Sequence, residues 1–181
     1  MRRYLLPIAA GLVLGGLVHL LSTLALPRLA LDDAYARLAQ LGALNALRLV
    51  PEPTPFAAAM PRMDPAFESA VCRYDLSRGA LRVRVPVTAD YTSVSFYTRH
   101  GLAYYALNDR SAGRRLIELE LMTPAQRAAL PEDEDITAAD RLIVESPTTE
   151  GLVYIRALVR ERGARGAVRA RLNEASCAPA A

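Results

Sequence analysis

The sequence contains no lysine and no tryptophan, so all 22 of its basic side chains are arginines. A formal net charge of +3 and a sequence pI of about 9.1 would suit a nucleic-acid-binding protein. The arginines are spread along the chain, however, and alternate with acidic residues, as in RRLIELE at 114–120 and VRERGARG at 159–166. Because a phosphate-binding surface needs its positive charge gathered on one side, this distribution argues against a nucleic-acid partner.

Histidine and cysteine are also scarce, with two residues of each. A zinc site needs three or four clustered His, Cys or carboxylate ligands, so the sequence predicts no metal site. His100 is the only histidine outside the N-terminal apolar segment, and its turn sequence RHG is typical of a solvated side chain. The sequence has no G-x-S-x-G motif and no glycine-rich phosphate loop, so we expect no cofactor and no nucleophilic catalytic residue.

Acidic residues offer the remaining candidates for chemistry. Residues 132–135 crowd four carboxylates together, but they lack the alternating ligands and central glycine of a calcium loop, so we expect a solvated acidic loop. Asp75, Asp109 and Glu145 lie near predicted strand ends. General acid-base catalysis would need two such carboxylates at a fixed separation, with one pKa raised by burial, and nothing in the sequence predicts that pair.

A long uncharged segment lies near the start of the chain, where residues 5–26 contain no Asp, Glu, Lys or Arg. At about 1.5 Å rise per residue, a helix of this length covers the roughly 30 Å hydrocarbon core of a bilayer. The segment exceeds the roughly 7–15 apolar residues of a secretory signal, and the nearest A-x-A triplet, residues 34–36, lies beyond it in an amphipathic stretch. We therefore expect an uncleaved transmembrane anchor, with residues 5–26 in the lipid bilayer.

The charges that flank the anchor predict its orientation, because positive residues beside a span tend to stay in the cytoplasm. Arg2 and Arg3 outweigh Arg28, which two aspartates soon follow. We therefore expect a cytoplasmic N-terminus and a periplasmic C-terminal domain. Within the anchor, Gly11 and Gly15 form a G-x-x-x-G pair that would allow close helix packing, although glycine is common in such helices without this role.

Export would place Cys72 and Cys177 in an oxidising compartment, where an even number of cysteines indicates a candidate disulfide. The bond would attach the C-terminal tail to the start of the folded domain. It could restrict the unfolded chain by roughly 4–5 kcal/mol. The alternative is two unpaired thiols, one buried in a strand and one in a frayed tail.

The sequence pattern changes twice after the anchor. Residues 31–44 carry apolar side chains at helical spacing and predict a short amphipathic helix, which could lie on the membrane or pack on the domain. Residues 45–50 could form a strand, and the five prolines of residues 51–65 indicate a stiff, extended connector. We therefore divide the chain into an anchor (1–30), a helix with a proline-rich connector (31–65) and a β-rich domain (66–181).

From residue 66 onward, short runs of β-type pattern are separated by turn residues. The run ALRVRVPV alternates strictly, so Leu81, Val83 and Val85 should face a core while Arg82 and Arg84 face solvent. Short connections predict antiparallel neighbours in a meander.

Two helices are expected among these strands. A threonine cap followed by proline predicts one from residue 123, and residues 163–175 predict another near the C-terminus. The fold class is therefore mainly β (α+β), with an N-terminal transmembrane helix followed by an antiparallel sheet or sandwich of about seven strands with short covering helices.

The turn sequence NDRSAGRR gathers Arg110, Arg114 and Arg115 at one strand end. The three arginines could bind an anionic group or a partner's carboxylates by bidentate contacts, or they could simply pair with Asp109 and Glu118. Aromatic residues on the adjacent strands could complete the core or line a sugar or peptide groove; they are Tyr91, Phe96, Tyr97, Tyr104 and Tyr105.

Two segments resemble a known protein family. FESAVCRYDLSRGALRVRVPVTADYTSVSFYTRHG (67–101) resembles the opening of domain-of-unknown-function family 1254, where a strand ending in Asp-Leu leads to a valine-proline strand and then to a tyrosine-rich strand. RLIVESPTTEGLVYIRALV (141–159) resembles its closing segment, where a Ser-Pro-Thr break precedes a strand that contains an arginine. The resemblance covers roughly residues 64–173 and implies no catalytic residues, since none are established for the family.

The resemblance is to short bacterial inner-membrane members with one N-terminal span. It implies a companion protein of domain-of-unknown-function family 1214, which is often encoded beside such members. Longer relatives carry both domains in one chain with β-rich, jelly-roll-like folds. Because this chain lacks their second domain and their tryptophans, any activity that needs both domains would require a partner.

We therefore expect a membrane-anchored periplasmic β-domain of the bacterial cell envelope that works by binding and is not itself an enzyme. A tether raises local concentration and makes even a weak interface effective. The alternative is a membrane-anchored enzyme that acts on envelope carbohydrate or lipid, with a site completed by a partner chain. A third hypothesis is a small-molecule or glycan-binding module. An exposed strand edge would favour the first hypothesis, and a pocket with converging carboxylates would favour the second.

Overall fold

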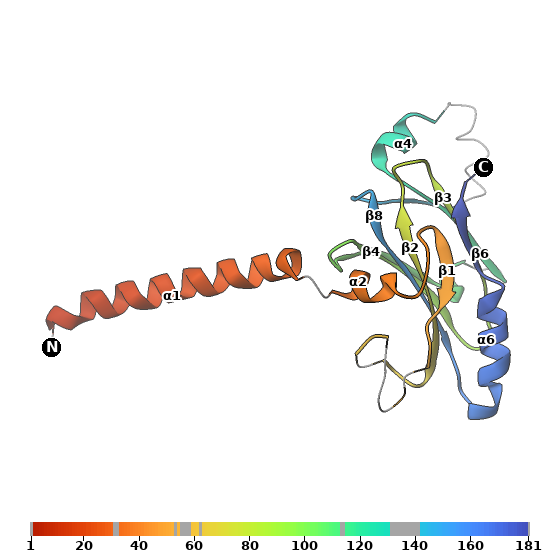
Figure 1. Cartoon of the computed structure of the whole chain (residues 1–181), viewed down its shortest axis with the longest axis horizontal. Coiled ribbons are helices and arrows are strands. Elements are labelled where there is room, and N and C mark those ends of the chain that lie inside the picture. The colour runs from red at the N-terminus through yellow and green to blue at the C-terminus, as the bar shows by residue number, and fades with distance from the viewer. Residues whose placement is uncertain are drawn as a thin grey trace. The chain divides into compact units, whose positions relative to one another are not determined.

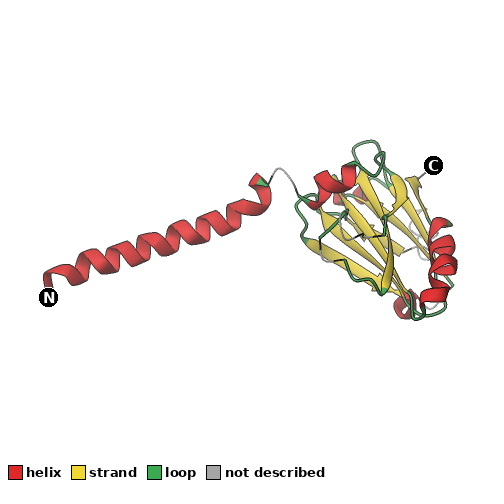
Figure 2. Ribbon diagram, turned by 60° about the horizontal axis from the view of Figure 1, so that its bottom comes forward, coloured by secondary structure: helices red, strands yellow, loops and turns green. Residues whose placement is uncertain are grey.

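The structure, a computed structural model, describes residues 2–30, 33–52, 54, 59–61, 63–112, 115–130 and 142–180. The chain forms two compact units, Met1–Asp33 and Ala34–Ala181. The first unit holds one long helix, and the second is a two-layered body of strands with short helices around it (Figures 1 and 2).

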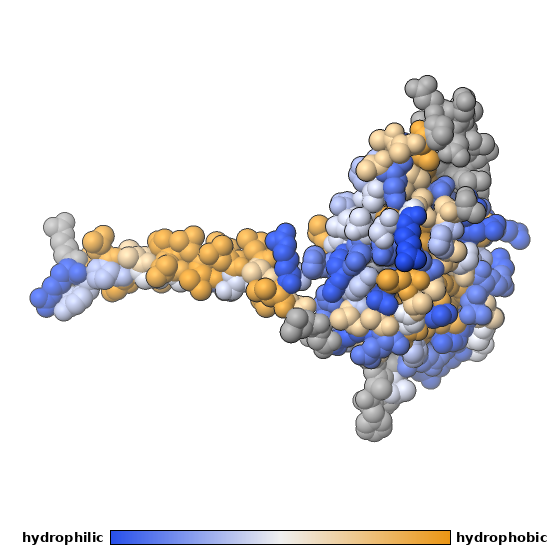
Figure 3. Space-filling view, turned by 45° about the horizontal axis from the view of Figure 1, so that its top comes forward, coloured by the Kyte–Doolittle hydropathy of each residue, from blue (hydrophilic) through white to orange (hydrophobic). Residues whose placement is uncertain are grey.

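The first unit consists of α1 (Arg2–Leu29), whose surface is apolar along most of its length (Figure 3). Its leucine and valine side chains are exposed. A helix pairs its backbone groups internally, as any segment in hydrocarbon must. In length and composition α1 is sufficient to cross a membrane, a property that it shares with N-terminal signal sequences.

The second unit is a sandwich of two sheets with strand orders β1-β2-β8-β4-β5 and β7-β6-β3-β9. Neighbouring strands are antiparallel, except that β6 and β7 are parallel. The five-stranded sheet consists of β1 (Ala46–Leu49), β2 (Phe67–Asp75), β8 (Glu150–Leu158), β4 (Thr92–Thr98) and β5 (Ala103–Asn108). The four-stranded sheet consists of β7 (Leu142–Glu145), β6 (Leu116–Met122), β3 (Leu81–Pro86) and β9 (Ser176–Pro179). The predicted mainly β, α+β fold is confirmed, with nine strands in the described residues instead of about seven.

The core lies between the two sheets, because each strand turns alternate side chains inward. In β3 the predicted alternation is confirmed: Leu81, Val83 and Val85 are fully buried, whereas Arg82 is half-buried and Arg84 is exposed. The inward side chains of both sheets form one cluster, which includes Ala70, Tyr74, Val94, Phe96, Leu119 and Ile155.

The strand order shows that the predicted meander is wrong. Most strands that follow each other in the chain lie in different sheets, and only β1–β2, β4–β5 and β6–β7 are both consecutive and paired. β8 instead lies between β2 and β4 and pairs with both along nearly its whole length. A short turn permits a hairpin without requiring one. The long apolar strand β8 satisfies its backbone groups on both sides only in the interior of a sheet.

The amphipathic helix predicted within residues 31–44 corresponds to α2 (Ala34–Ala39). Of the two expected locations, on the membrane or on the domain, α2 occupies the second: its buried side chains pack on the outer face of the five-stranded sheet. On this face, Tyr35 and Leu38 form a small apolar cluster with Val50, Val71 and Leu152. Together with β1, α2 belongs to the compact unit Ala34–Ala181, which also contains the later strands.

The remaining helices are short and lie at the ends of strands. α3 (Asp109–Ala112) follows β5, and α4 (Pro124–Ala128) begins as predicted, because the Thr123 side chain accepts from the Gln126 amide in a capping box. The turn η1 (Arg162–Ala164) leads into α6 (Arg165–Asn173), which packs against β1, β2, β3 and β8.

The tail predicted beyond residue 175 is strand β9, which pairs antiparallel with β3. The four residues of β9, which end in proline, are too few to show the alternating apolar pattern of a strand. Strand formation there depends on the exposed edge of β3, which offers unpaired backbone groups to any nearby extended segment.

Candidate functional site

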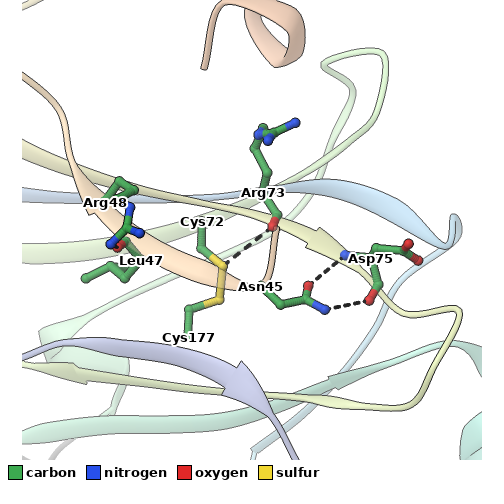
Figure 4. The surroundings of a disulfide bond; sticks show 7 residues. All are labelled: Asn45, Leu47, Arg48, Cys72, Arg73, Asp75 and Cys177. Carbon is green, nitrogen blue, oxygen red and sulfur yellow. Dashed lines mark hydrogen bonds between the residues drawn. A yellow bond between two sulfur atoms is a disulfide. The ribbon is translucent and has the colours of Figure 1, made fainter. Parts of the chain in front are cut away.

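A disulfide between Cys72 and Cys177 joins the two sheets across the core (Figure 4). Cys72 lies on β2 and Cys177 on β9, and both are buried among the apolar side chains of the core. The bond links positions 105 residues apart in the sequence. It therefore fastens the last described strand of the chain to the opposite sheet.

Asn45 holds the start of β1 against the end of β2, close to this disulfide (Figure 4). Its Nδ2 donates to the Asp75 carbonyl at 3.0 Å, and its Oδ1 accepts from the Asp75 amide at 2.8 Å. Its own backbone amide donates to the Arg73 carbonyl at 2.7 Å. Asn45 has a φ of 53°, a left-handed conformation that asparagine tolerates better than most residues.

A pocket of about 380 Å³ lies on the outer face of the five-stranded sheet. Its floor consists of side chains of β2 and β8 that alternate with the core residues of the same strands, and these side chains are Phe67, Ser69, Val71, Leu152, Tyr154 and Arg156. Its walls come from α2, from the described part of residues 60–64, from Tyr97 and from Gly101. Pockets of this size and apolar character are typical of small-molecule sites.

Polar groups lie toward one end of the pocket floor. Ser69 and Arg156 are direct partners in the β2–β8 ladder, and the Ser69 and Tyr154 hydroxyls are 3.0 Å apart. The Arg156 guanidinium carbon lies 5.4 Å from the centroid of the Phe67 ring and 5.9 Å from that of Tyr154. Among the residues that the structure describes, no carboxylate pairs with Arg156. The pocket therefore combines an apolar floor with one cation that forms no ion pair with a described residue.

Contacts around Tyr35 fix α2 and hence one wall of the pocket. Two guanidinium groups lie over the Tyr35 ring, whose centroid is 5.1 Å from Arg73 Cζ and 4.3 Å from Arg99 Cζ. Burial raises the pKa of Tyr35, and the negative charge of Glu150 raises it further. Arg73 also donates to the Gly42 carbonyl at 2.9 Å. A cation–π pair of this kind contributes about 0.5–1 kcal/mol at a partly exposed position.

A buried ion pair attaches α6 to β2 beside the sandwich. The Glu68 side chain is 2% exposed, and its two oxygens accept from Arg165 Nη1 at 2.6 Å and from Arg169 Nη1 at 2.8 Å. Arg165 also donates to the Pro65 carbonyl at 2.6 Å. A carboxylate with both oxygens bound in this way serves to dock the helix and is not free to act as a catalytic base.

The Ser-Pro-Thr break contributes to a buried cluster of hydroxyl groups. Tyr74 Oη lies 2.9 Å from both Tyr104 Oη and Ser146 Oγ. Burial raises the pKa of Tyr104 well above its ordinary value, although the hydrogen bond from Ser146 opposes this shift. Tyr74 and Ser146 are fully buried, so the cluster stabilises the end of the sandwich and is closed to a substrate.

Gly151 is required beside this cluster. A Cβ atom at this position would collide with the Tyr97 carbonyl oxygen and with the Tyr74 hydroxyl. The glycine after the Ser-Pro-Thr-Thr-Glu sequence therefore allows β8 to begin directly against β4 and the tyrosine cluster.

The predicted arginine cluster lies only partly within the described residues. Arg110 within α3 and Arg115 just before β6 are exposed, and Arg114 lies outside the described residues. Glu118, one of the expected partners, instead faces Arg84 across the β3–β6 ladder at 3.5 Å. Anion or partner binding by these arginines remains a prediction.

The aromatic residues that the sequence left unassigned divide between core and pocket. Phe96 is buried in the core, with the rings of Tyr104 and Tyr105 centred 6.2 Å and 6.0 Å from it. Tyr97 lines the pocket. Tyr91 packs edge-on against Phe67, whose ring forms part of the pocket floor.

The carboxylates considered for acid-base chemistry each have a local role. Asp75 Oδ1 accepts from the Ser77 amide at 2.8 Å, and this hydrogen bond lowers the pKa of Asp75. Asp109 Oδ1 accepts from the first backbone amide of β4 at 3.4 Å. Glu145 lies 3.3 Å from Arg127 Nε. The acidic stretch at 132–135 lies outside the described residues, and no group of metal-ligating side chains occurs within the described ones.

The other candidates occupy open positions. His100 is exposed in the turn between β4 and β5. A Cβ atom added at Gly11 or Gly15 would meet no other atom within 4 Å in this single chain, so helix packing through these glycines remains a prediction.

Sequence reasoning did not single out Arg156, Ser69 or Glu68 as site residues. A signal was nevertheless present for Arg156, which interrupts the apolar run of β8, whereas four of the nine residues of β2 are polar and gave Ser69 and Glu68 no such contrast. A charged residue in the middle of a buried strand needs a partner, and the sequence alone does not show whether that partner is protein or ligand.

The fold and the pocket define a class of protein: a two-sheet sandwich with an inter-sheet disulfide and a long apolar helix at its N-terminus. The chain belongs to the family described as protein of unknown function (DUF1254), whose sequence profile matches residues 44–179. No curated protein matches the chain.

Two solved structures are similar to this fold. The VPA0106 protein from Vibrio parahaemolyticus is 12% identical with a TM-score of 0.60, over 82% of this chain and 34% of that one. An uncharacterised protein from Burkholderia cenocepacia is 16% identical with a TM-score of 0.45, over 74% of this chain and 41% of that one. The chain thus spans about a third of the length of the Vibrio protein, whose likeness shows the shared fold alone.

Proposed function

We propose that the chain is a tethered binding component of a bacterial cell envelope. In this proposal α1 crosses the inner membrane with residues 5–26 in the bilayer, the N-terminus is cytoplasmic and the sandwich is periplasmic. The excess of arginine before the span supports this orientation. The disulfide supports an oxidising compartment, because such bonds are rare in the cytoplasm.

The pocket on the five-stranded sheet is the observation that carries the binding function. Its described lining is apolar and aromatic, with hydroxyl groups and one arginine at one end. Asp64 is the one carboxylate in that lining, and its Oδ1 accepts from the Ala66 amide at 2.9 Å. A glycosidase-type reaction requires two carboxylates on either side of a bond. The lining therefore favours binding over the alternative, an envelope enzyme.

A companion chain is the proposed macromolecular partner. The chain spans 34% of the length of the Vibrio protein that shares its fold, which leaves room for a second domain elsewhere. We assign that role to a membrane protein of domain-of-unknown-function family 1214. β5 is a suitable contact, because it is a sheet edge without charged residues, and Tyr105 on it is exposed.

Affinity isolation of the full-length protein in mild detergent tests this proposal. We expect a companion protein in stoichiometric amount, together with a small molecule that mass spectrometry detects in the denatured sample. A variant with Ala106→Pro on β5 should lose the companion, because proline blocks strand pairing at an edge. A protein that elutes alone, carries no small molecule and hydrolyses envelope glycans would contradict the proposal and support the enzyme.

A further inference from the structure

We infer that the pocket on the five-stranded sheet binds a single-chain amphipathic carboxylate, with the carboxylate paired to Arg156 and the apolar body resting on Val71 and Leu152. The inference rests on the proposed binding function and specifies its ligand.

The first argument is the unpaired charge of Arg156. Its guanidinium lies against the faces of Phe67 and Tyr154, which leaves the donors at its edge directed away from the rings. Two buried side-chain atoms within the described part of the chain lack a partner, Arg82 Nε and Ser93 Oγ, and no atom of Arg156 is among them. No described residue forms a hydrogen bond or ion pair with this side chain, and Arg156 lines the pocket, so its donors are accessible there in the planar arrangement that matches a carboxylate.

The second argument is the polarity around this arginine. Ser69 on β2 and Ser93 on β4 are its direct ladder partners on the two sides of β8. The Ser69 hydroxyl bonds to Tyr154, whereas the Ser93 hydroxyl is buried without a partner among the described residues. Of these two serines only Ser69 lines the pocket, so its hydroxyl and that of Tyr154 supply the further donors for the two oxygens of a carboxylate.

The third argument is the apolar remainder of the pocket. Away from Arg156, the floor consists of Val71 and Leu152, and Leu38 of α2 covers one side. Met60 and Met63 contribute flexible side chains that adapt to chains of different shape. A volume of about 380 Å³ suits one acyl chain and is small for a lipid with two.

Charge complementarity decides the sign of the head group. A cationic ligand would meet the positive charge of Arg156, and a neutral one would cover the guanidinium without compensating its lost hydration. Asp64 also lines the pocket, but no ion pair joins it to Arg156, and its Oδ1 is occupied by the Ala66 amide. An anion with an apolar body is therefore the ligand class that satisfies both parts of the pocket.

Photo-crosslinking of the full chain in lipid nanodiscs tests the inference. The probe is a laurate analogue with a diazirine at the end of its chain, and its methyl ester serves as the neutral probe. We expect the acid to label peptides that contain residues 59–71 and 150–158, and the ester to label them at least about tenfold less. Labelling of α1 by probe dissolved in the lipid should be equal for both and provides an internal reference.

Three variants separate charge from folding. Arg156→Gln should reduce pocket labelling by the acid at least about tenfold, while Arg156→Lys should retain part of it because the charge remains. Arg78→Gln removes an exposed arginine from the β2–β3 turn and should change nothing. Equal thermal unfolding of the three variants shows that the sandwich is intact.

The outcomes distinguish this inference from the function on which it rests. Equal pocket labelling by acid and ester would overturn the carboxylate assignment and leave a binding function in place. Stronger competition by dodecyl phosphate than by laurate would also overturn it, in favour of a phosphate head group. If neither probe labels the pocket, the ligand class is wrong, and the companion recovered by affinity isolation decides the binding function separately.

Discussion

Glu68 and Arg165 connect β2 to α6 through an ion pair in which Glu68 Oε1 and Arg165 Nη1 are 2.6 Å apart. The carboxylate is almost fully buried, whereas the two arginines that bind it are partly exposed. The energetic consequence is asymmetric, because losing the carboxylate leaves two positive charges facing each other at the edge of the core.

Replacement of this carboxylate should therefore destabilise the sandwich. We expect Glu68→Gln to lower the free energy of unfolding by about 3 kcal/mol. The matched control is Glu174→Gln, which removes an exposed pair with Arg171 and should cost less than about 0.5 kcal/mol. Urea unfolding followed by circular dichroism measures both, and equal midpoints for the two variants would contradict the docking role of Glu68.

The disulfide should contribute strongly to the stability of the domain. Replacing Cys72 and Cys177 with alanine should lower the free energy of unfolding by about 4–5 kcal/mol, because the bond closes a loop of 105 residues. A reducing agent should shift the unfolding midpoint of the native protein and leave that of the double variant unchanged. No shift with the reductant would show that the thiols are unpaired in solution.

Gly151 should tolerate no side chain. Gly151→Ala places a methyl group against the Tyr97 carbonyl and the Tyr74 hydroxyl, and we expect a loss of about 2–3 kcal/mol. Gly166→Ala in α6 is the control, because its added methyl group meets no atom within 4 Å and should stabilise the helix by up to about 1 kcal/mol. Thermal unfolding should therefore shift in opposite directions for the two variants.

Stability should fall at alkaline pH because of Tyr104. Burial holds its folded-state pKa above the unfolded value of about 10, so below this pH both states keep the proton and the stabilisation is complete. Above about pH 10 only the unfolded chain loses the proton, so the free energy of unfolding decreases as pH rises. Tyr104→Phe should flatten this decrease, whereas Tyr105→Phe at an exposed position should preserve it. An unchanged slope in Tyr104→Phe would exclude Tyr104 as its source.

The location of the two ends of the chain can be tested directly. We expect alkaline phosphatase fused to the C-terminus to be active and green fluorescent protein fused there to be dark, because the sandwich is proposed to be periplasmic. The intact mass of the membrane-extracted protein should include residues 1–30. A mature protein that lacks them would identify α1 as a cleaved signal, and a fluorescent fusion would reverse the orientation.

Local pattern was sufficient to predict most of the strands and several of their faces. Strict alternation in β3 placed Leu81, Val83 and Val85 in the core, and the Thr123 cap placed the start of α4. These features depend on neighbours within a few residues. β9 lacked such a signal, because it is a strand only by virtue of its pairing with β3.

Strand order and the pocket depend on residues that are distant in the sequence. Ser69 and Arg156 become ladder partners only when β8 inserts beside β2, and Leu38 joins them only when α2 docks on the same face. Turn lengths and periodicity are compatible with several strand orders, so no local rule selects this one. The resemblance to the family indicated the fold class, but it identified no binding or catalytic residues.

The central place of β8 has a consequence for biosynthesis. β2 and β4 leave a gap in their sheet that β8 fills, and the ribosome makes β8 only after most of the chain. The five-stranded sheet therefore closes late, and the earlier strands must stay unpaired on one edge while the chain is still being made. The disulfide forms later still, because Cys177 is synthesised 105 residues after Cys72 and lies beyond β8.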